Sequence, residues 1–145
     1  MNTSTLTQAD AMADRALKKG REMNVQPLTV AILDAGGHLV VLKREDHSSL
    51  LRPDIAIGKA WGALGMGFGG RELARRADKV PSFFTALNAM SGGRMVPVAG
   101  GALIRDNTGA ILGSIGVSGD TSDNDELCVV DAVRSQGLTP DTGDN

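Results

Sequence analysis

The sequence has few of the residues on which several classes of protein depend. It contains one cysteine, Cys128, no tyrosine and only four aromatic residues in total, and its formal net charge is -2. A single cysteine excludes an internal disulfide and any zinc or iron–sulfur site built from several cysteines. The shortage of aromatic and basic side chains disfavours nucleic acid as a partner. No apolar run approaches the roughly 20 residues of a bilayer-spanning helix, so we expect no membrane partner either.

The chain has the size of one domain. Its 145 residues can bury one hydrophobic core without the help of disulfides or a structural metal, and no linker or internal repeat divides them. We expect a single domain over residues 1–145, with the polar segment 139–145 disordered. The N-terminal residues lack the basic and apolar regions of a signal peptide, so the expected location is cytoplasmic.

Apolar periodicity and turn residues predict the order of secondary structure. The expected helices span residues 7–23, 53–66, 70–79, 82–90 and 127–134. The expected strands form two hairpins, 28–33 with 38–42 and 99–105 with 110–117. Thr7 is the expected N-cap of the first helix, Asn24 its left-handed end, and Gly36-Gly37 the turn of the first hairpin. This order predicts an α+β domain with an antiparallel β-sheet and flanking helices.

Glycine is abundant. The chain has 19 glycines, about twice the average usage, and most of them fall in clusters. Glycine permits tight turns and close approach between elements. With few aromatic residues, the pattern also indicates that a subunit or a neighbouring element of the same chain can come close over these small residues.

Charged residues concentrate around the junction between the second expected strand and the second expected helix. The group consists of Arg44, Asp46, Arg52, Asp54 and Lys59. We expect the guanidinium of Arg44 and the ammonium of Lys59 to turn into a cleft beside the glycines of this helix and to hold a carboxylate. The alternative interpretation is a solvated, charged rim.

The two histidines do not form a metal-binding pattern. His38 and His47 are nine residues apart, which matches no ligand spacing on a regular element, and the sequence predicts no metal site. His47 follows the end of a strand, where loops collect functional groups. It is a candidate acid–base residue together with Asp46 and Asp54.

Two motifs resemble those of a known family. The first reads AILDAGGHLV from Ala31, followed by Arg44, Asp46 and the segment DIAIGKA from Asp54. The second reads PVAGGALI from Pro97 and continues as ILGSIGVSG from Ile111. In this order they resemble the GlcG/HbpS-like family of haem-binding or haem-degrading domains, and also the C-terminal domain of PduO-type corrinoid adenosyltransferases.

The resemblance implies a ligand and an assembly. It implies an antiparallel sheet flanked by helices, assembled as a homo-oligomer from dimer to octamer, with ligands in clefts that subunits share. The implied function is small-molecule binding, with haem or another tetrapyrrole as the ligand. Arg44 and Lys59 would hold its carboxylates, with Arg52 and His38 as further contacts.

A second hypothesis belongs to a different class. Some members of the family are thought to offer a histidine from the first helix to haem or iron, and the first expected helix here contains none. This favours a cofactor-independent catabolic enzyme, an isomerase, tautomerase or hydrolase, that acts on a small carboxylated metabolite. Arg44 and Lys59 would anchor the substrate, and His47, Asp46 or Asp54 would act as acid and base.

Overall fold

The computed structural model describes residues 3–144 as an α+β fold with a five-stranded sheet. The elements are α1 (Leu6–Glu22), β1 (Thr29–Asp34), β2 (Leu39–Arg44), α2 (Arg52–Met66), α3 (Gly70–Lys79), α4 (Pro81–Met90), β3 (Gly101–Arg105), β4 (Ile111–Ser118), α5 (Ser122–Ser135) and β5 (Thr139–Asp141). The strand order is β2-β1-β4-β3-β5, and every pairing is antiparallel. The predicted fold class is therefore confirmed, with β5 as an additional strand.

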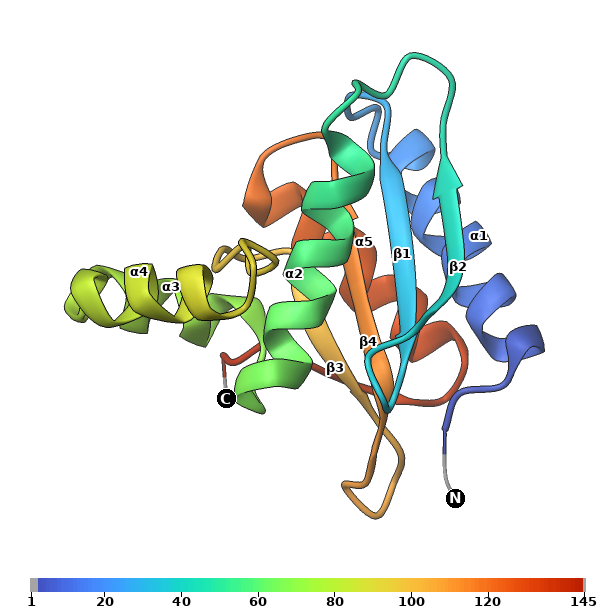
Figure 1. Cartoon of the computed structure of the whole chain (residues 1–145). Helices are drawn as coiled ribbons and strands as arrows, with labels where there is room; N and C mark the ends of the chain where they lie inside the picture. The colour runs from blue at the N-terminus through green and yellow to red at the C-terminus, as the bar shows by residue number, and fades with distance from the viewer. Residues whose placement is uncertain (1–2, 145) are drawn as a thin grey trace.

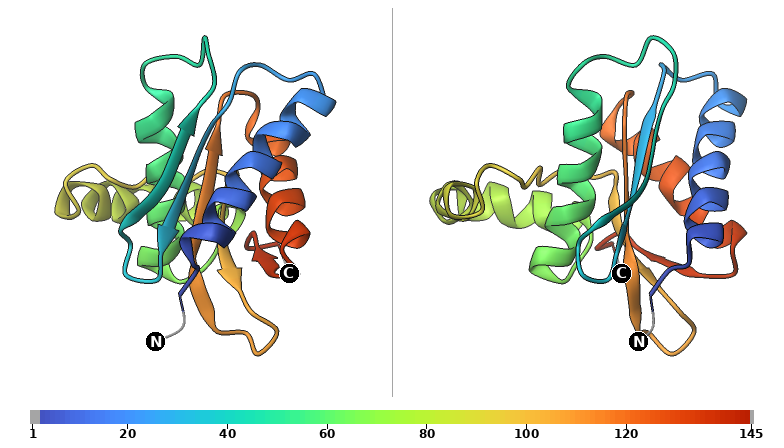
Figure 2. Two further views of the ribbon diagram at one scale, coloured as in Figure 1. Left: turned by 90° about the vertical axis from the view of Figure 1, so that its right-hand side faces the viewer. Right: turned by 45° about the vertical axis from the view of Figure 1, so that its right-hand side comes forward.

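The sheet separates two helical layers. Helices α1 and α5 cover one face, and α2 lies alone on the other (Figures 1 and 2). Helices α3 and α4 extend sideways from the C-terminal end of α2, away from the sheet (Figure 1). We call this α3–α4 pair, residues 70–90, the arm.

The main core lies between the sheet and the pair α1 and α5. Its largest fully buried members include Met12, Ile32, Ile115 and Val129. Burial of such a side chain contributes about 1.5–3 kcal/mol. A smaller cluster, centred on Leu73, joins the base of the arm to α2.

Glycines allow α2 to lie very close to the sheet. A Cβ atom added to Gly116 on β4 would collide with the backbone carbonyl of Ala56 on α2, and one added to Gly101 would collide with the carbonyl of Lys59. The clustered glycines suggested close contacts with another subunit or with a neighbouring element. At these two positions, glycine permits close contacts within the chain.

The first hairpin turn forms as predicted. Gly37 has a φ of 85°, and the carboxylate of Asp34 accepts hydrogen bonds from the backbone N–H groups of Gly36 and His38, both at 2.9 Å. Only Gly37 of the glycine pair has positive φ. Asn24, at φ 56°, is the left-handed residue predicted after α1.

Helix starts differ from the prediction. Helix α1 is capped by Thr5, whose hydroxyl accepts from the N–H of Gln8 while the Gln8 side chain accepts from the Thr5 N–H, so Thr7 lies inside the helix. Helix α5 is capped by Thr121 and begins at Ser122, well before residue 127.

The C-terminal segment is a further correction. Thr139–Asp141 was expected to be disordered, yet it forms β5 and pairs with β3. Arg105 Nε donates to the Asp141 carboxylate at 2.9 Å, which fixes the strand to its neighbour. Within residues 3–144, no helix combines the length and apolar character needed to cross a bilayer.

Candidate functional site

Three of the residues predicted for the site lie together at the end of β2. Arg44, Asp46 and His47 line a cavity of about 540 Å³, whose remaining walls are Arg21, Pro27 and Glu45; we call it the β2-end pocket. Glu45 is held by Arg21 at 3.1 Å and by the backbone N–H of Leu28 at 2.7 Å. His47 has a φ of 71°, an unusual conformation for a residue other than glycine.

Lys59 is not part of this pocket. It is 3% exposed, and its ammonium contacts the Asp125 carboxylate at 3.1 Å and the carbonyl of Val117 at 2.9 Å. Burial lowers the pKa of Lys59, and burial also raises the pKa of Asp125. The buried pair joins α2 to α5 across the end of β4, so the expected role of Lys59 as a surface anchor for a carboxylate does not fit its position.

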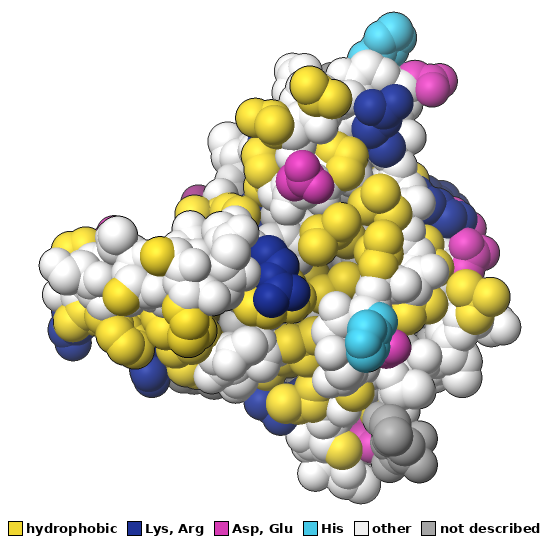
Figure 3. Space-filling model, viewed as in Figure 1, with side chains coloured by type: hydrophobic (Ala, Val, Ile, Leu, Met, Phe, Trp, Pro, Cys, Tyr) yellow, Lys and Arg dark blue, Asp and Glu magenta, His cyan; other side chains and the backbone are white. Residues whose placement is uncertain are grey.

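Arg52 and His38 also lie apart from one another. Arg52 Nη1 donates to the Ser118 hydroxyl at 3.1 Å in the first turn of α2. His38 lies at the opposite end of the sheet, in the hairpin turn, where its Nδ1 is 3.3 Å from the Asp34 carboxylate. The space-filling view accordingly shows two separate histidine positions (Figure 3). The structure does not bring His38 to the other predicted residues.

Asp54 lies on the rim of a different, mainly apolar cavity of about 440 Å³, which we call the α2 cleft. Its walls are Leu51, Asp54, Ile55, Ile57, Gly58, Trp61, Gly93, Arg94 and Val96. They come from α2 and from the segment between α4 and β3. Hydrophobic side chains gather over α2 and β2 on this side of the molecule (Figure 3).

The α2 cleft contains an oriented arginine. The guanidinium carbon of Arg94 lies 4.2 Å from the centre of the Trp61 ring, and Arg94 Nε donates to the carbonyl of Ser91 at 2.8 Å. Its two terminal amino groups have no partner among the described residues. A guanidinium held in this way presents a preorganised fork to a carboxylate.

Neither Arg94 nor Trp61 was predicted. They are 33 positions apart in the sequence, and no local pattern indicates that the two side chains stack. The only local signal is the Gly92-Gly93 pair, at φ 76° and 78°, which marks a tight reversal between α4 and β3 just before Arg94.

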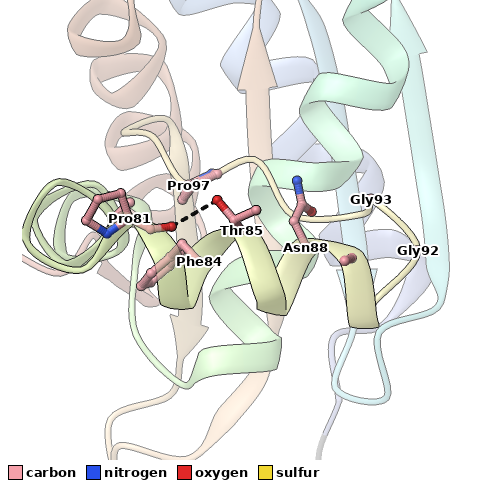
Figure 4. A pocket seen from close by; sticks show the side chains of 9 residues that line it. Pro81, Phe84, Thr85, Asn88, Gly92, Gly93 and Pro97 are labelled. Atoms are coloured by element: carbon pink, nitrogen blue, oxygen red, sulfur yellow. Dashed lines mark hydrogen bonds between the residues drawn. The ribbon is translucent and has the colours of Figure 1, made fainter.

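A second cavity flanks the same segment on the arm side. It measures about 650 Å³ and is lined by Ala77, Pro81, Phe84, Thr85, Asn88, Ala89, Gly92, Gly93 and Pro97 (Figure 4). The Thr85 hydroxyl donates to the carbonyl of Pro81 at 3.0 Å, and the Asn88 side-chain oxygen accepts from the N–H of Met95 at 3.1 Å. These bonds stabilise α4 and the start of the connecting segment.

Two other kinds of chemistry lack support in the described part of the chain. No group of three or more His, Cys, Asp or Glu side chains there is placed to hold a metal ion. Cys128 is buried on α5, and burial raises the pKa of its thiol to about 11. A thiol in this state is a poor nucleophile.

Comparison with known proteins gives sequence relatives over most of the chain. A model of the family described as haem degrading protein, HbpS-like, matches residues 5–134. An uncharacterized 15.0 kDa protein from the dhaT-dhaS intergenic region of Citrobacter freundii is 31% identical over 125 residues, 86% of each chain. The corrinoid adenosyltransferase PduO of the same organism is 31% identical over 111 residues, 76% of this chain but only 32% of PduO.

Solved structures share the fold. ORFY of Klebsiella pneumoniae has a TM-score of 0.84 at 29% identity, covering 92% of this chain and 90% of that one. A double mutant of HbpS from Streptomyces reticuli has a TM-score of 0.81 at 26% identity, covering 93% and 88%. A crystal structure of a PduOC–haem complex has a TM-score of 0.83 at 24% identity, covering 94% and 96%. By sequence and fold, the chain belongs to the HbpS-like family.

Proposed function

We propose that this protein binds a carboxylated tetrapyrrole of the haem class in the α2 cleft. The observation that carries the proposal is the geometry of Arg94, which is stacked on Trp61 at the edge of an apolar cavity, with terminal amino groups that no described residue contacts through a hydrogen bond or ion pair. A planar ligand with an apolar body and a peripheral carboxylate matches this arrangement. The family description, haem degrading protein, supports the same ligand class.

The apolar and the charged side chains of the cleft contribute to binding in different ways. Leu51, Ile55, Ile57 and Val96 exclude water from the ring, and each Å² of apolar surface buried contributes about 25 cal/mol. Arg94 binds the carboxylate, and a charge-assisted hydrogen bond of this kind contributes about 1.5–3 kcal/mol. Asp54, an anion on the same rim, would disfavour a second carboxylate at its own end and so orient the ligand.

The cleft fits the ring and its carboxylate but offers no side chain suited to the iron. Of the residues 3–144, those that line it include no histidine, cysteine, methionine or tyrosine, the side chains that commonly ligate haem iron. Both histidines lie outside it. We therefore assign ligand affinity to the ring and the carboxylate, and we derive no step that involves the iron.

The intrinsic fluorescence of the protein can test this proposal. Trp61 is the only tryptophan, the chain has no tyrosine, and the Trp61 ring lines the α2 cleft, so the emission comes from one residue at the proposed site. Titration with haemin and with metal-free protoporphyrin should quench this emission to saturation at one ligand per chain. We expect the two dissociation constants to agree within about threefold, because the iron makes no protein bond in the cleft.

Variants outside the cleft provide the controls. His38→Ala and His47→Ala should leave both affinities unchanged, since neither ring lines the cavity. Loss of protoporphyrin affinity in either histidine variant would place the ligand elsewhere. Haemin affinity more than tenfold above that of protoporphyrin, and lost in either histidine variant, would show that a histidine ligates the iron.

The β2-end pocket supports a second candidate function, an enzyme acting on a small carboxylated metabolite. The supporting observation is the convergence of Arg44, Asp46 and His47 in one cavity, with His47 at positive φ. Addition of pyruvate or succinate should shift the imidazole NMR signals of His47 in wild type and not in Arg44→Met. Unshifted His47 signals at millimolar pyruvate and succinate would count against this candidate.

A further inference from the structure

Two glycines come directly before the arginine of the α2 cleft. Gly92 and Gly93, at φ 76° and 78°, turn the chain back between α4 and Arg94. Glycine has more backbone freedom than other residues, so this pair alone does not fix the direction of the next side chain. Arg94 is exposed, and a long side chain in such a place ordinarily samples many rotamers. Its defined position over Trp61 therefore depends on contacts that hold residues 91–95, which we call the Arg94 turn.

Asn88, in the last turn of α4, holds the Arg94 turn on both sides of the arginine. Its backbone carbonyl accepts a hydrogen bond from the N–H of Gly93 at 2.6 Å. Its side-chain oxygen accepts one from the N–H of Met95 at 3.1 Å. Figure 4 shows the Asn88 side chain pointing from α4 toward the segment that follows the helix. One residue thus bonds the neighbours of Arg94 in both directions along the chain.

Ser91 connects Asn88 to the guanidinium. The Ser91 hydroxyl donates to the Asn88 carbonyl at 3.2 Å, and the Ser91 carbonyl accepts from Arg94 Nε at 2.8 Å. Ser91 is 8% exposed and Met95 is 5% exposed, so the protein largely shields these bonds from water. Hydrogen bonds in such surroundings are stronger than hydrogen bonds in water. None of these bonds uses the terminal amino groups of Arg94.

The other end of the Arg94 turn lies against α2. The N–H of Val96 donates to the carbonyl of Gly58 at 3.3 Å. A Cβ atom added to Gly58 would lie 2.6 Å from the Val96 side chain and 2.9 Å from the carbonyl oxygen of Arg94. The backbone of Arg94 is therefore in close contact with the wall of the cleft, and the turn is held by α4 on one side and by α2 on the other.

We infer that Asn88 is a positioning residue for the α2 cleft, which holds Arg94 over Trp61 so that its terminal amino groups meet the ligand carboxylate. The inference rests on the proposed function, in which Arg94 binds that carboxylate. Asn88 belongs to the wall of the cavity on the arm side and not to that of the α2 cleft, so it acts through Arg94. A side chain that is already ordered loses less conformational entropy on binding, which raises the affinity.

A double-mutant cycle in the protoporphyrin titration tests whether Asn88 acts through Arg94. Asn88→Leu keeps the branched shape of the side chain but removes the oxygen that the Met95 N–H contacts. We expect it to weaken binding about 3- to 10-fold, because Arg94 must then become ordered on binding. In the Arg94→Met background, the same substitution should change the affinity by less than about twofold. Equal losses in the two backgrounds would overturn the inference, since a purely structural role does not depend on the guanidinium.

Thr85→Val is the matched control. Thr85 lies three residues before Asn88 on α4 and lines the same cavity, and its hydroxyl donates to the carbonyl of Pro81 at 3.0 Å. The valine removes a side-chain hydrogen bond of the same helix and leaves the contacts of the Arg94 turn in place, so we expect wild-type affinity. A loss as large as that of Asn88→Leu would count against a specific role of Asn88. Asn88→Ala should repeat the cycle if circular dichroism shows that Asn88→Leu does not fold.

A measurement without ligand separates this inference from the proposed function. The Nε–H group of Arg94 should give a distinct proton–nitrogen NMR signal in wild type and in Thr85→Val, identified by its loss in Arg94→Met. In Asn88→Leu this signal should move toward that of a solvent-exposed arginine. An unchanged signal would overturn the inference. If the signal moves as expected but wild type binds no protoporphyrin, the proposed function fails and the positioning of Arg94 by Asn88 is supported.

Discussion

Asp125→Asn should lower the free energy of unfolding by about 3–5 kcal/mol, among the largest losses that a single polar substitution can cause. In wild type, the Asp125 carboxylate accepts a hydrogen bond from the backbone N–H of Asp120 at 3.0 Å. The asparagine side chain keeps an oxygen that can accept the same hydrogen bond. The substitution removes the one carboxylate, among the residues that the structure describes, that contacts the buried ammonium of Lys59, at 3.1 Å. The cost arises because a charge that is almost fully buried loses its counter-ion.

The double variant Lys59→Met/Asp125→Asn should recover most of this loss. It contains no buried charge, and replacement of a buried ion pair by neutral groups is often neutral or stabilising. Urea unfolding of the single and double variants, followed by circular dichroism, measures both effects. Equal stability of Asp125→Asn and wild type would contradict the interpretation of Lys59 as a structural, charged group.

The same pair predicts a dependence on pH. Because burial raises the pKa of Asp125 above its ordinary 3.8, the folded state holds a proton that the unfolded state has released, and stability falls as pH rises from 3.8 to the raised value. Because burial lowers the pKa of Lys59 below its ordinary 10.5, stability rises between the lowered value and 10.5. Relative to the double variant, wild type should therefore be least stable between these two windows.

Gly116→Ala should destabilise the protein by about 3 kcal/mol or more, at the upper end of the range for overpacking. The added Cβ would collide with the carbonyl of Ala56 and lie 3.0 Å from the backbone N of Ala60. Both neighbours are backbone atoms of α2 and cannot rotate away, so the helix must move off β4. Thermal unfolding of the variant measures the loss.

Gly65→Ala is the matched control for this substitution. Gly65 lies in α2, has no positive φ, and its added Cβ would meet only Trp61 at 3.9 Å. Replacing a helical glycine by alanine in open space should stabilise the protein by about 0.5–1 kcal/mol. Similar effects of the two substitutions would show that close approach of α2 to the sheet is not what requires Gly116.

Local patterns predicted most of the secondary structure, but not all of it. The turn at Gly37 and the left-handed Asn24 are determined by residues within a few positions, and their conformations were predicted correctly. The N-cap of α1 was predicted at Thr7 but lies at Thr5, because two threonines compete at this helix start. β5 was missed because it is short, contains Pro140 and forms only by pairing with the edge of β3.

Tertiary packing determines the sites, and here the sequence was less informative. Arg44, Asp46 and His47 are close in sequence and meet in one pocket, as a local group can. Lys59 was assigned to a surface cleft, yet it pairs with Asp125, 66 positions away. Arg94 and Trp61 meet only because the segment after α4 folds back on α2. Contacts at such separations follow from the packing of whole elements, which periodicity does not specify.

Two arginine variants, compared in the protoporphyrin titration of Trp61 fluorescence, test most directly whether the ligand binds in the α2 cleft. Arg94→Met keeps an aliphatic chain over Trp61 but removes the guanidinium, and Arg44→Met makes the same change in the β2-end pocket. We expect Arg94→Met to weaken binding about 10- to 100-fold, because one charge-assisted contact is lost, and Arg44→Met to bind like wild type. Unchanged affinity in Arg94→Met together with weakened affinity in Arg44→Met would contradict this expectation and place the ligand at the end of β2.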